Sequence, residues 1–256
     1  MGTQLRALIR LFRPATGKAF YKRENAAMRE VAQQMSSIRD SHVRVQTIKK
    51  PIAKSGKRRA PAAVTRVEAA MAARLRQVVE ESEQNDWRKK TASGTEGALC
   101  RVNNWPLKDT TTRSLRSGLK APCKKARRAL AVARLKATDA NLHELRKGVK
   151  DLWYDVRLLG GDRPTQIEAL TRRLRDLGQR FGDDHDLAML VAARADNPLP
   201  EAEDWDTVEK AIAVRRPRLQ RAGLRLASKV LIRKPRAFAD FVIGPWKTWH
   251  CRRAKK

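Results

Sequence analysis

Apolar residues along most of the chain recur at intervals of three and four positions, which is the spacing of an amphipathic helix. Val, Ile and Thr are scattered, and they never alternate with polar residues over the length of a strand. The pattern therefore predicts an all-α protein. We expect helices over residues 4–13, 18–48 (broken near Ser36-Ser37), 65–88, 119–136, 139–159, 163–181, 183–196, 205–231 and 235–252.

Breaking and capping residues mark several of these boundaries. Pro14 and Gly17 should end the first helix, and either Thr138 or Asp139 should cap the helix over 139–159. Residues 49–62 hold two prolines, one glycine and six Lys or Arg, so we expect a mobile basic linker there.

The helix within LHELRKGVKDLWYDVRLL, residues 142–159, separates its side chains into three arcs at about 100° per residue. One arc of about 100° is mainly basic and contains His143, Arg146, Lys147, Lys150, Tyr154 and Arg157. A neighbouring arc of about 120° is apolar and contains Leu142, Leu145, Val149, Leu152, Trp153, Val156 and Leu159. A third arc, with Glu144, Asp151 and Asp155, should face water. The basic row is then either a solvated face or the wall of a groove beside the core.

Three other segments place basic residues on one face of a helix. They are Lys120, Lys124, Arg127 and Arg134; Arg218, Arg221, Arg225 and Lys229; and Arg6, Arg10 and Arg13. An arginine fork donates two parallel hydrogen bonds to a phosphate, whereas lysine acts as a point charge. Four such rows fit a ligand with a repeating phosphate backbone.

The composition points in the same direction. The 256 residues include 57 Lys plus Arg against 27 Asp plus Glu, a net charge of +30, and 41% are hydrophobic. This excess predicts salt-sensitive binding to a polyanion, which could be nucleic acid, polyphosphate or an anionic membrane surface. No apolar run reaches the roughly 18 residues of a membrane span. Arginines interrupt the first segment, so we expect no secretory signal there.

The sequence offers few residues arranged for catalysis, metal binding or disulfide formation. Cys100, Cys123 and Cys251 are odd in number and widely spaced, which favours reduced thiols in the cytoplasm over disulfides or a zinc site. The run GDDHD over 182–186 invites a metal interpretation, but helix-cap and helix-dipole roles explain its acids better. No phosphate-binding glycine loop, dinucleotide motif or HExxH occurs. We therefore expect no metal, no cofactor and no enzymatic activity.

Two pairs of segments within the chain are similar in sequence. Aligning residues 5–13 with 149–157 places Arg6 on Lys150, Arg10 on Tyr154 and Arg13 on Arg157. A second match sets IRDSHV (38–43) against FGDDHD (181–186), in the same order along the chain. The pair suggests a duplicated helical unit, with chance similarity between amphipathic helices as the alternative.

These segments resemble the CHAD domain, the conserved histidine α-helical domain. LHELRKGVKDLWYDVRLL resembles its second signature helix, and GLKAPCKKARRALAVARLKATDANLHELRK resembles the approach to that helix. YKRENAAMREVAQQMSSIRDSHV, NNWPL and KPRAFADFVIGPWKTW are similar to other parts of the family. The resemblance spans essentially the whole chain. It predicts a single domain over 1–256, with a first half over about 1–112 and a second over about 113–256.

The resemblance implies two four-helix bundles related by a pseudo-twofold axis, with a basic cleft between them. It implies non-catalytic binding of inorganic polyphosphate, often with targeting to polyphosphate granules. The binding residues it implies are His143, Arg146, Lys147, Lys150, Arg157, Lys120, Lys124, Arg127, Arg128, Arg6, Arg10, Arg13 and Arg23, and the row over 218–229 adds Arg221 and Arg225. The chain departs from the family where the first signature histidine is absent and where Cys123 replaces an expected aromatic residue.

Two alternatives stay open at this point. A charge of +30 would also hold nucleic acid without specificity, although no groove-entering motif or interleaved aromatic residues accompany the basic rows. A phosphohydrolase would need metal-binding carboxylates that the sequence does not offer.

Overall fold

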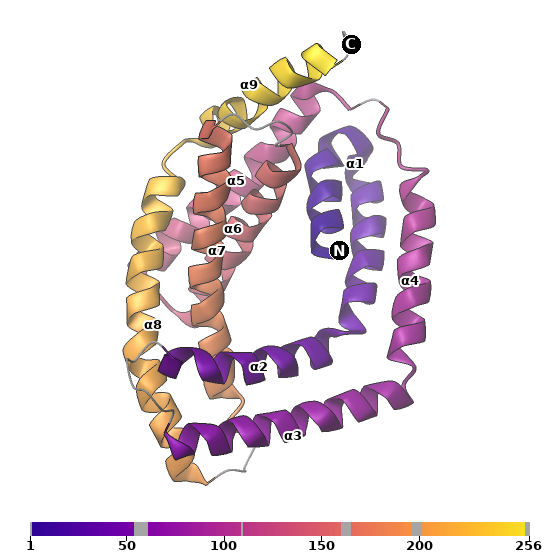
Figure 1. The fold of residues 1–256 in the computed structure, drawn as a ribbon. Coiled ribbons are helices and arrows are strands. Elements are labelled where there is room, and N and C mark those ends of the chain that lie inside the picture. The colour runs from indigo at the N-terminus through magenta and orange to yellow at the C-terminus, as the bar shows by residue number, and fades with distance from the viewer. Residues whose placement is uncertain (1, 54–60, 109, 160–164, 196–200, 254–256) are drawn as a thin grey trace. The chain divides into compact units, whose positions relative to one another are not determined.

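The computed structural model describes residues 2–53, 61–108, 110–159, 165–195 and 201–253. Over these ranges the chain forms nine helices and no strand (Figure 1), which confirms the prediction of an all-α protein. The helices are α1 (Gly2–Gln33), α2 (Ser36–Ala53), α3 (Ala62–Gln84), α4 (Trp87–Val102), α5 (Thr112–Leu135), α6 (Asp139–Leu159), α7 (Thr165–Ala192), α8 (Ala202–Val230) and α9 (Pro235–Arg253).

α1 bends back on itself at Gly17. The backbone there has φ of 87°, a conformation that glycine adopts without steric cost. The two limbs of α1 lie side by side (Figure 1), and Arg6 Nε donates a hydrogen bond of 3.0 Å to Asn25 Oδ1 across them. The expected break at Gly17 is confirmed. The prediction that Pro14 also ends the helix is wrong, because Pro14 lies inside the helical turn before the bend.

Local capping explains both a success and a failure of the sequence pattern. Thr138 caps α6, since its Oγ1 accepts a hydrogen bond of 3.3 Å from the backbone N–H of Asn141, and α6 begins at the predicted residue. α5 begins seven residues before the predicted start, at a capping box that the apolar pattern did not reveal. There Ser114 N donates to Thr111 Oγ1 at 3.1 Å, and Thr111 N donates to Ser114 Oγ at 3.0 Å.

Two other boundaries also differ from the prediction. α7 continues through Gly182, where a break between two helices was expected, and Gly182 is buried within it. An interior glycine costs a helix only about 1 kcal/mol relative to alanine, which tertiary packing readily offsets. α2 continues to Ala53, so the prediction of a linker is wrong for residues 49–53, and residues 54–60 of the expected linker lie outside the described part of the chain.

The chain divides into two compact units. Unit 1 consists of Met1–Arg29, Gly97–Phe181 and Ala222–Lys256, and unit 2 consists of Glu30–Glu96 and Gly182–Arg221. Each unit therefore combines segments from both halves of the sequence. The division near residue 112, the two four-helix bundles, their pseudo-twofold axis and a basic cleft between them stay predictions.

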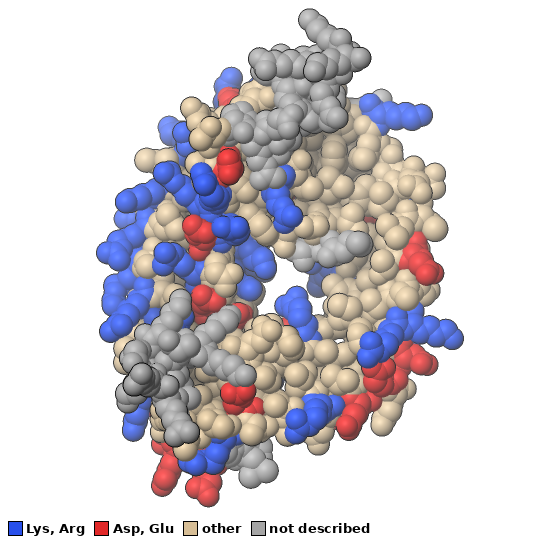
Figure 2. All heavy atoms as spheres, in the orientation of Figure 1, with Lys and Arg blue, Asp and Glu red and all other residues tan. Residues whose placement is uncertain are grey.

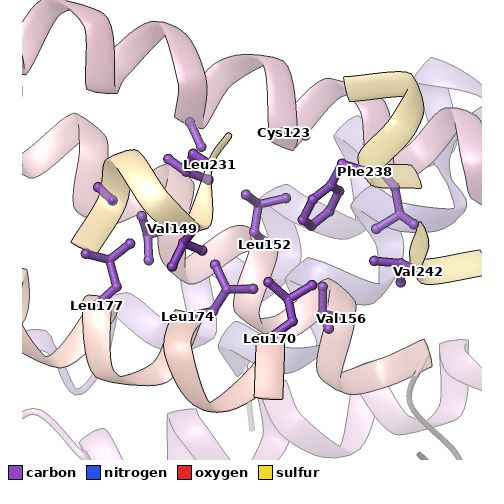
Figure 3. Close-up of a cluster of buried hydrophobic side chains, with 14 of the residues drawn as sticks. Cys123, Val149, Leu152, Val156, Leu170, Leu174, Leu177, Leu231, Phe238 and Val242 are labelled. Carbon is purple, nitrogen blue, oxygen red and sulfur yellow. The ribbon is translucent and has the colours of Figure 1, made fainter. Parts of the chain in front are cut away.

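The core of unit 1 is built on the apolar arc of α6. Leu145, Val149, Leu152 and Val156 are fully buried, and Trp153 at the edge of the arc is half-buried. Each fully buried side chain of this size contributes about 1.5–3 kcal/mol to folding. Figure 3 shows Val149, Leu152 and Val156 among Leu170, Leu174 and Leu177 of α7, with Phe238 and Val242 of α9 at one side. The predicted apolar face of α6 is confirmed.

Two glycines set how closely the helices of unit 1 approach one another. A Cβ atom on Gly118 of α5 would lie 2.1 Å from the backbone oxygen of Leu11 in α1. A Cβ atom on Gly148 of α6 would lie 2.9 Å from the Cα of Ala126 in α5. Because real Cβ atoms do not come this close to backbone, only glycine permits these contacts. They bring the basic faces of α1, α5 and α6 together.

Unit 2 has its own core and an ion pair between an exposed arginine and a buried aspartate. Ile48, Val67, Leu190 and Trp205 belong to one cluster of buried side chains. The guanidinium of Arg66 makes two hydrogen bonds, of 2.7 and 2.6 Å, to the carboxylate of Asp204. Asp204 is buried, and this hydrogen-bonded pairing lowers the pKa of its carboxyl group. Its charge is thereby compensated inside the unit.

Candidate anion-binding site

A pocket of about 750 Å³ lies within unit 1. We call it the α1–α5–α6 pocket, after the helices that supply its walls. The described residues that line it are Arg6, Arg10, Arg13, Pro14 and Tyr21 from α1, Ser117, Gly118, Ala121, Pro122 and Lys125 from α5, and Arg146, Lys147, Lys150 and Asp151 from α6. This lining contains seven Lys or Arg and one acidic residue. The excess of positive charge favours an anionic ligand.

The α1 wall keeps two arginines positioned without neutralising them. Arg6 donates its hydrogen bond to the uncharged amide of Asn25. The guanidinium carbon of Arg13 lies 5.2 Å from the centre of the Tyr21 ring, a cation–π distance. Both interactions connect the two limbs of α1 across the bend at Gly17. They restrict the side chains while leaving the positive charge available to a ligand.

Arg10 has a different environment, because two carboxylates surround it. Its guanidinium lies 2.8 Å from Asp151 Oδ1 and 3.3 Å from Asp155 Oδ1. Asp155 is completely buried, and burial raises its pKa to about 7 even though Arg10 opposes the shift. The prediction that Asp155 faces water is wrong. The helical periodicity of α6 gives the angular position of Asp155 around the helix. It does not show that α1 covers that side of α6 with Arg10.

Glu144 does not line the pocket, but it is ion-paired with two lysines that do. Its carboxylate oxygens are 2.6 Å from Lys147 Nζ and 3.6 Å from Lys125 Nζ. The hydrogen bond from Lys147 lowers the pKa of Glu144, and the charge of Lys125 acts in the same direction. Since Glu144 is about half exposed, it can give up these lysines to a more highly charged anion at little cost.

His143 is half-buried on α6, one turn from Arg146 and Lys147. Burial lowers its pKa, and the positive charges of Arg146 and Lys147 lower it further. The imidazole is therefore neutral at neutral pH. His143 does not line the α1–α5–α6 pocket, so its predicted role as a direct ligand is not part of this site's geometry.

A comparison with protein families bears on this arrangement. The model of the CHAD domain family matches residues 2–195. The chain belongs to the CHAD domain family. It has no significant match among curated proteins or among solved structures. In this CHAD domain, then, six of the predicted ligands line one pocket, and these are Arg6, Arg10, Arg13, Arg146, Lys147 and Lys150.

The other predicted ligands of this CHAD domain lie elsewhere. Arg23 pairs with the buried carboxylate of Glu24 at 3.0 Å, and Arg101 reaches the second oxygen of that carboxylate at 3.2 Å. Arg157 is exposed, with its guanidinium carbon 5.4 Å from the centre of the Trp153 ring. The other predicted ligands away from the pocket on exposed or half-buried surface are Lys120, Lys124, Arg128, Arg221 and Arg225. Figure 2 shows Lys and Arg gathered over α8, which carries the last two.

Lys125 is the pocket cation that the sequence did not single out. It shares one face of α5 with Ser117, Gly118, Ala121 and Pro122, at helical spacing. Four small or compact residues in that row mark the face that another helix can approach closely. That signal was present in SGLKAPCKK, residues 117–125, but was hidden by the neighbouring basic residues at 120, 124, 127 and 128.

Arg127, another predicted ligand, is turned away from the pocket. Its guanidinium donates hydrogen bonds to the carbonyl oxygens of Leu231, Ile232 (2.9 Å) and Arg233 (3.1 Å). These carbonyls follow the C-terminal end of α8, where a helix leaves acceptors unsatisfied and a cation is favourable. The structure therefore gives Arg127 a capping role.

Replacing Arg127 with Met should lower the free energy of unfolding by about 1–2 kcal/mol, because carbonyls at the end of α8 lose a charged donor. Urea denaturation measures this. The matched control is Arg128→Met, which removes the same charge from an exposed neighbour and should change stability by less than about 0.5 kcal/mol. If Arg127→Met instead spared stability and weakened anion binding more than Arg128→Met, Arg127 would be a ligand.

The described part of the chain contains no group of three or more His, Cys, Asp or Glu arranged to hold a metal ion. In unit 2, Asp184 of the GDDHD run accepts hydrogen bonds of 3.0 Å from both Arg216 and Gln220. None of the described helices is long and apolar enough to cross a membrane.

The structure describes two free thiols with different environments. Cys123 is buried, and burial raises the pKa of its thiol to about 11, whereas Cys100 is exposed.

Proposed function

We propose that this CHAD domain binds inorganic polyphosphate through the α1–α5–α6 pocket and does not catalyse a reaction on it. The observation that carries the proposal is the convergence of seven Lys or Arg from three helices on one cavity of about 750 Å³. Membership of the CHAD family supports the choice of ligand. Targeting to polyphosphate granules in the cytoplasm, which the family resemblance implies, is part of the same proposal.

The chemistry of the pocket suits a chain of phosphates. Arg6, Arg13 and Arg146 can each donate more than one hydrogen bond to phosphate oxygens, whereas the lysines supply point charges. A hydrogen bond to a charged group is worth about 1.5–3 kcal/mol, so a few such contacts give tight binding. Every phosphate of the polymer is charged, and a strand can therefore satisfy several of these donors at once.

Competition between two polyanions tests the choice of ligand. We expect polyphosphate to displace fluorescent duplex DNA from the protein at a matched concentration of phosphate groups. Salt dependence alone would not separate the two ligands, because both bind through charge. With about six phosphate contacts, the affinity for DNA already falls roughly a thousandfold between about 50 and 200 mM salt. If DNA competed equally well or better, the protein would be a general nucleic-acid binder.

Assays of phosphate release test the non-catalytic part of the proposal. Incubation of the protein with polyphosphate or a nucleoside triphosphate, with and without Mg²⁺, should release no phosphate above the uncatalysed background. A release that depended on His143 or on a pocket residue would instead identify a phosphohydrolase.

A further inference from the structure

The environment of Arg10 contains one negative charge more than it can neutralise. Asp151 and Asp155 both lie within ion-pair distance of the guanidinium, at 2.8 and 3.3 Å. Arg10 also donates a hydrogen bond to the backbone oxygen of Asp151 at 3.5 Å. With both carboxylates ionised, this group of three side chains carries a net negative charge. It does so in the wall of a pocket that is otherwise strongly positive.

Of the two carboxylates, Asp155 is the one suited to accept a proton. Its side chain is 0% exposed, whereas that of Asp151 is 27% exposed. Asp155 Oδ2 has no hydrogen-bond partner in the described part of the chain, so the ionised form is incompletely stabilised. A buried carboxylate in this situation favours its neutral form.

The charges around Asp155 come from two helices. Arg10 of α1 favours the ionised carboxylate, and Asp151 of α6 disfavours it. α9 also packs against α6, and there Asp240 is ion-paired with Arg116 of α5 at 2.6 Å. A ligand that competes for Arg10 therefore removes the charge that keeps Asp155 ionised.

We propose that Asp155 is a positioning residue that couples anion binding in the α1–α5–α6 pocket to the uptake of one proton. When a phosphate group pairs with Arg10, Asp155 Oδ2 takes a proton from the solvent, and the guanidinium is released toward the pocket. One O–H bond forms on Asp155, and the bond that held the proton in a buffer acid or hydronium ion of the solvent breaks. This inference rests on the proposed function for the identity of the anion, but not for the coupling itself.

The direction of the pH dependence follows from the two states of Asp155. In the free protein its pKa is about 7, because burial outweighs the attraction of Arg10. A bound anion beside it raises that pKa further, since a nearby negative charge disfavours the carboxylate. Binding therefore takes up a proton between the two pKa values, and affinity falls as the pH rises through that window. We expect an affinity about tenfold lower at about pH 8.5 than at about pH 6.5.

Calorimetry on the full chain tests the coupling directly. Titration with a probe anion in buffers of different ionisation enthalpy gives the number of protons taken up on binding. Two probes are needed, long-chain polyphosphate and dextran sulfate, because the sulfate groups do not titrate in this pH range. We expect the wild type to take up about half a proton near pH 7, where Asp155 is already half protonated, and closer to one proton about one pH unit higher, with both probes.

Two variants assign the proton. Asp155→Asn should abolish the uptake and flatten the pH profile while the protein still binds, since the amide keeps the shape of the carboxyl group. His143→Gln should retain the uptake, because the lowered pKa of His143 places its titration below the window. Proton uptake that survived Asp155→Asn would overturn the inference.

The wild-type measurement decides the matter even if Asp155→Asn fails to fold. Binding of both probes without proton uptake would overturn the coupling and leave the proposed function standing. Binding of dextran sulfate with proton uptake, but no binding of polyphosphate, would support the coupling and refute the proposed function.

Discussion

Reversing two charges on the α6 wall, Arg146→Glu with Lys150→Glu, should weaken polyphosphate binding by more than about a hundredfold. Both side chains line the α1–α5–α6 pocket, one turn apart on the same face of α6. Losing each charged hydrogen bond costs about 1.5–3 kcal/mol, and each 1.4 kcal/mol is a factor of about ten. The introduced carboxylates add repulsion between the pocket and the ligand. Fluorescence anisotropy with labelled polyphosphate measures the change.

The matched control is Arg172→Glu with Arg173→Glu on α7. Both arginines are exposed, and neither lines the pocket, yet the net charge of the protein changes by the same amount. We expect only a few-fold loss of affinity, from the weaker long-range attraction of a less positive protein. Equal losses in the two double variants would mean that the ligand is held by diffuse charge. The circular dichroism of each variant checks that the helices are intact.

Arg157→Glu separates the pocket from the row predicted on the sequence. Arg157 belongs to the same basic arc as Lys150 but lies at the surface beside Trp153. The pocket geometry therefore predicts a loss smaller than that of the α7 control, which reverses two charges rather than one. A loss as large as that of Lys150→Glu alone would extend the binding surface along α6.

The sequence predicted α6 well because the helix is strongly amphipathic and is preceded by a capping residue, Thr138. Its bounds and its buried face both agree with the structure. What it could not supply was the identity of the neighbouring helix. Asp155 was expected in water, and Lys125 was not recognised, because both depend on where α1 lies. Helical periodicity describes one helix at a time, whereas a pocket needs the approach of several.

The predicted ligands show the same difference between what one helix reveals and what depends on its neighbours. All fifteen predicted ligands are cations or histidine on amphipathic helices, and six of them line the pocket. Arg127 belongs to the predicted basic row of α5, yet it caps the C-terminal end of α8. Arg23 is equally basic, yet it compensates a buried glutamate. Charge alone does not distinguish a ligand from an internal partner, because an arginine serves both purposes with the same hydrogen bonds.

Gly118 carries the second large prediction, because it fixes the distance between α1 and α5. In Gly118→Ala the new methyl group would lie 2.1 Å from the backbone oxygen of Leu11, so α1 would have to move. Overpacking of this kind costs about 1–3 kcal/mol or more, and the better helix propensity of alanine returns about 1 kcal/mol. We expect a net loss of about 2 kcal/mol in urea denaturation.

In Gly118→Ala, polyphosphate binding should weaken together with stability. Moving α1 withdraws Arg6, Arg10 and Arg13 from the α5 and α6 walls of the pocket. The control is Gly178→Ala on α7, where the nearest atom to the new methyl group would be Lys150 Cγ at 3.8 Å, an ordinary contact. That change should stabilise the protein by about 0.4–1 kcal/mol and leave binding unchanged. If Gly118→Ala were as stable as Gly178→Ala, α1 could not approach α5 as closely as the structure shows. The three-walled pocket would then lose its geometric basis, whatever the charge of its residues.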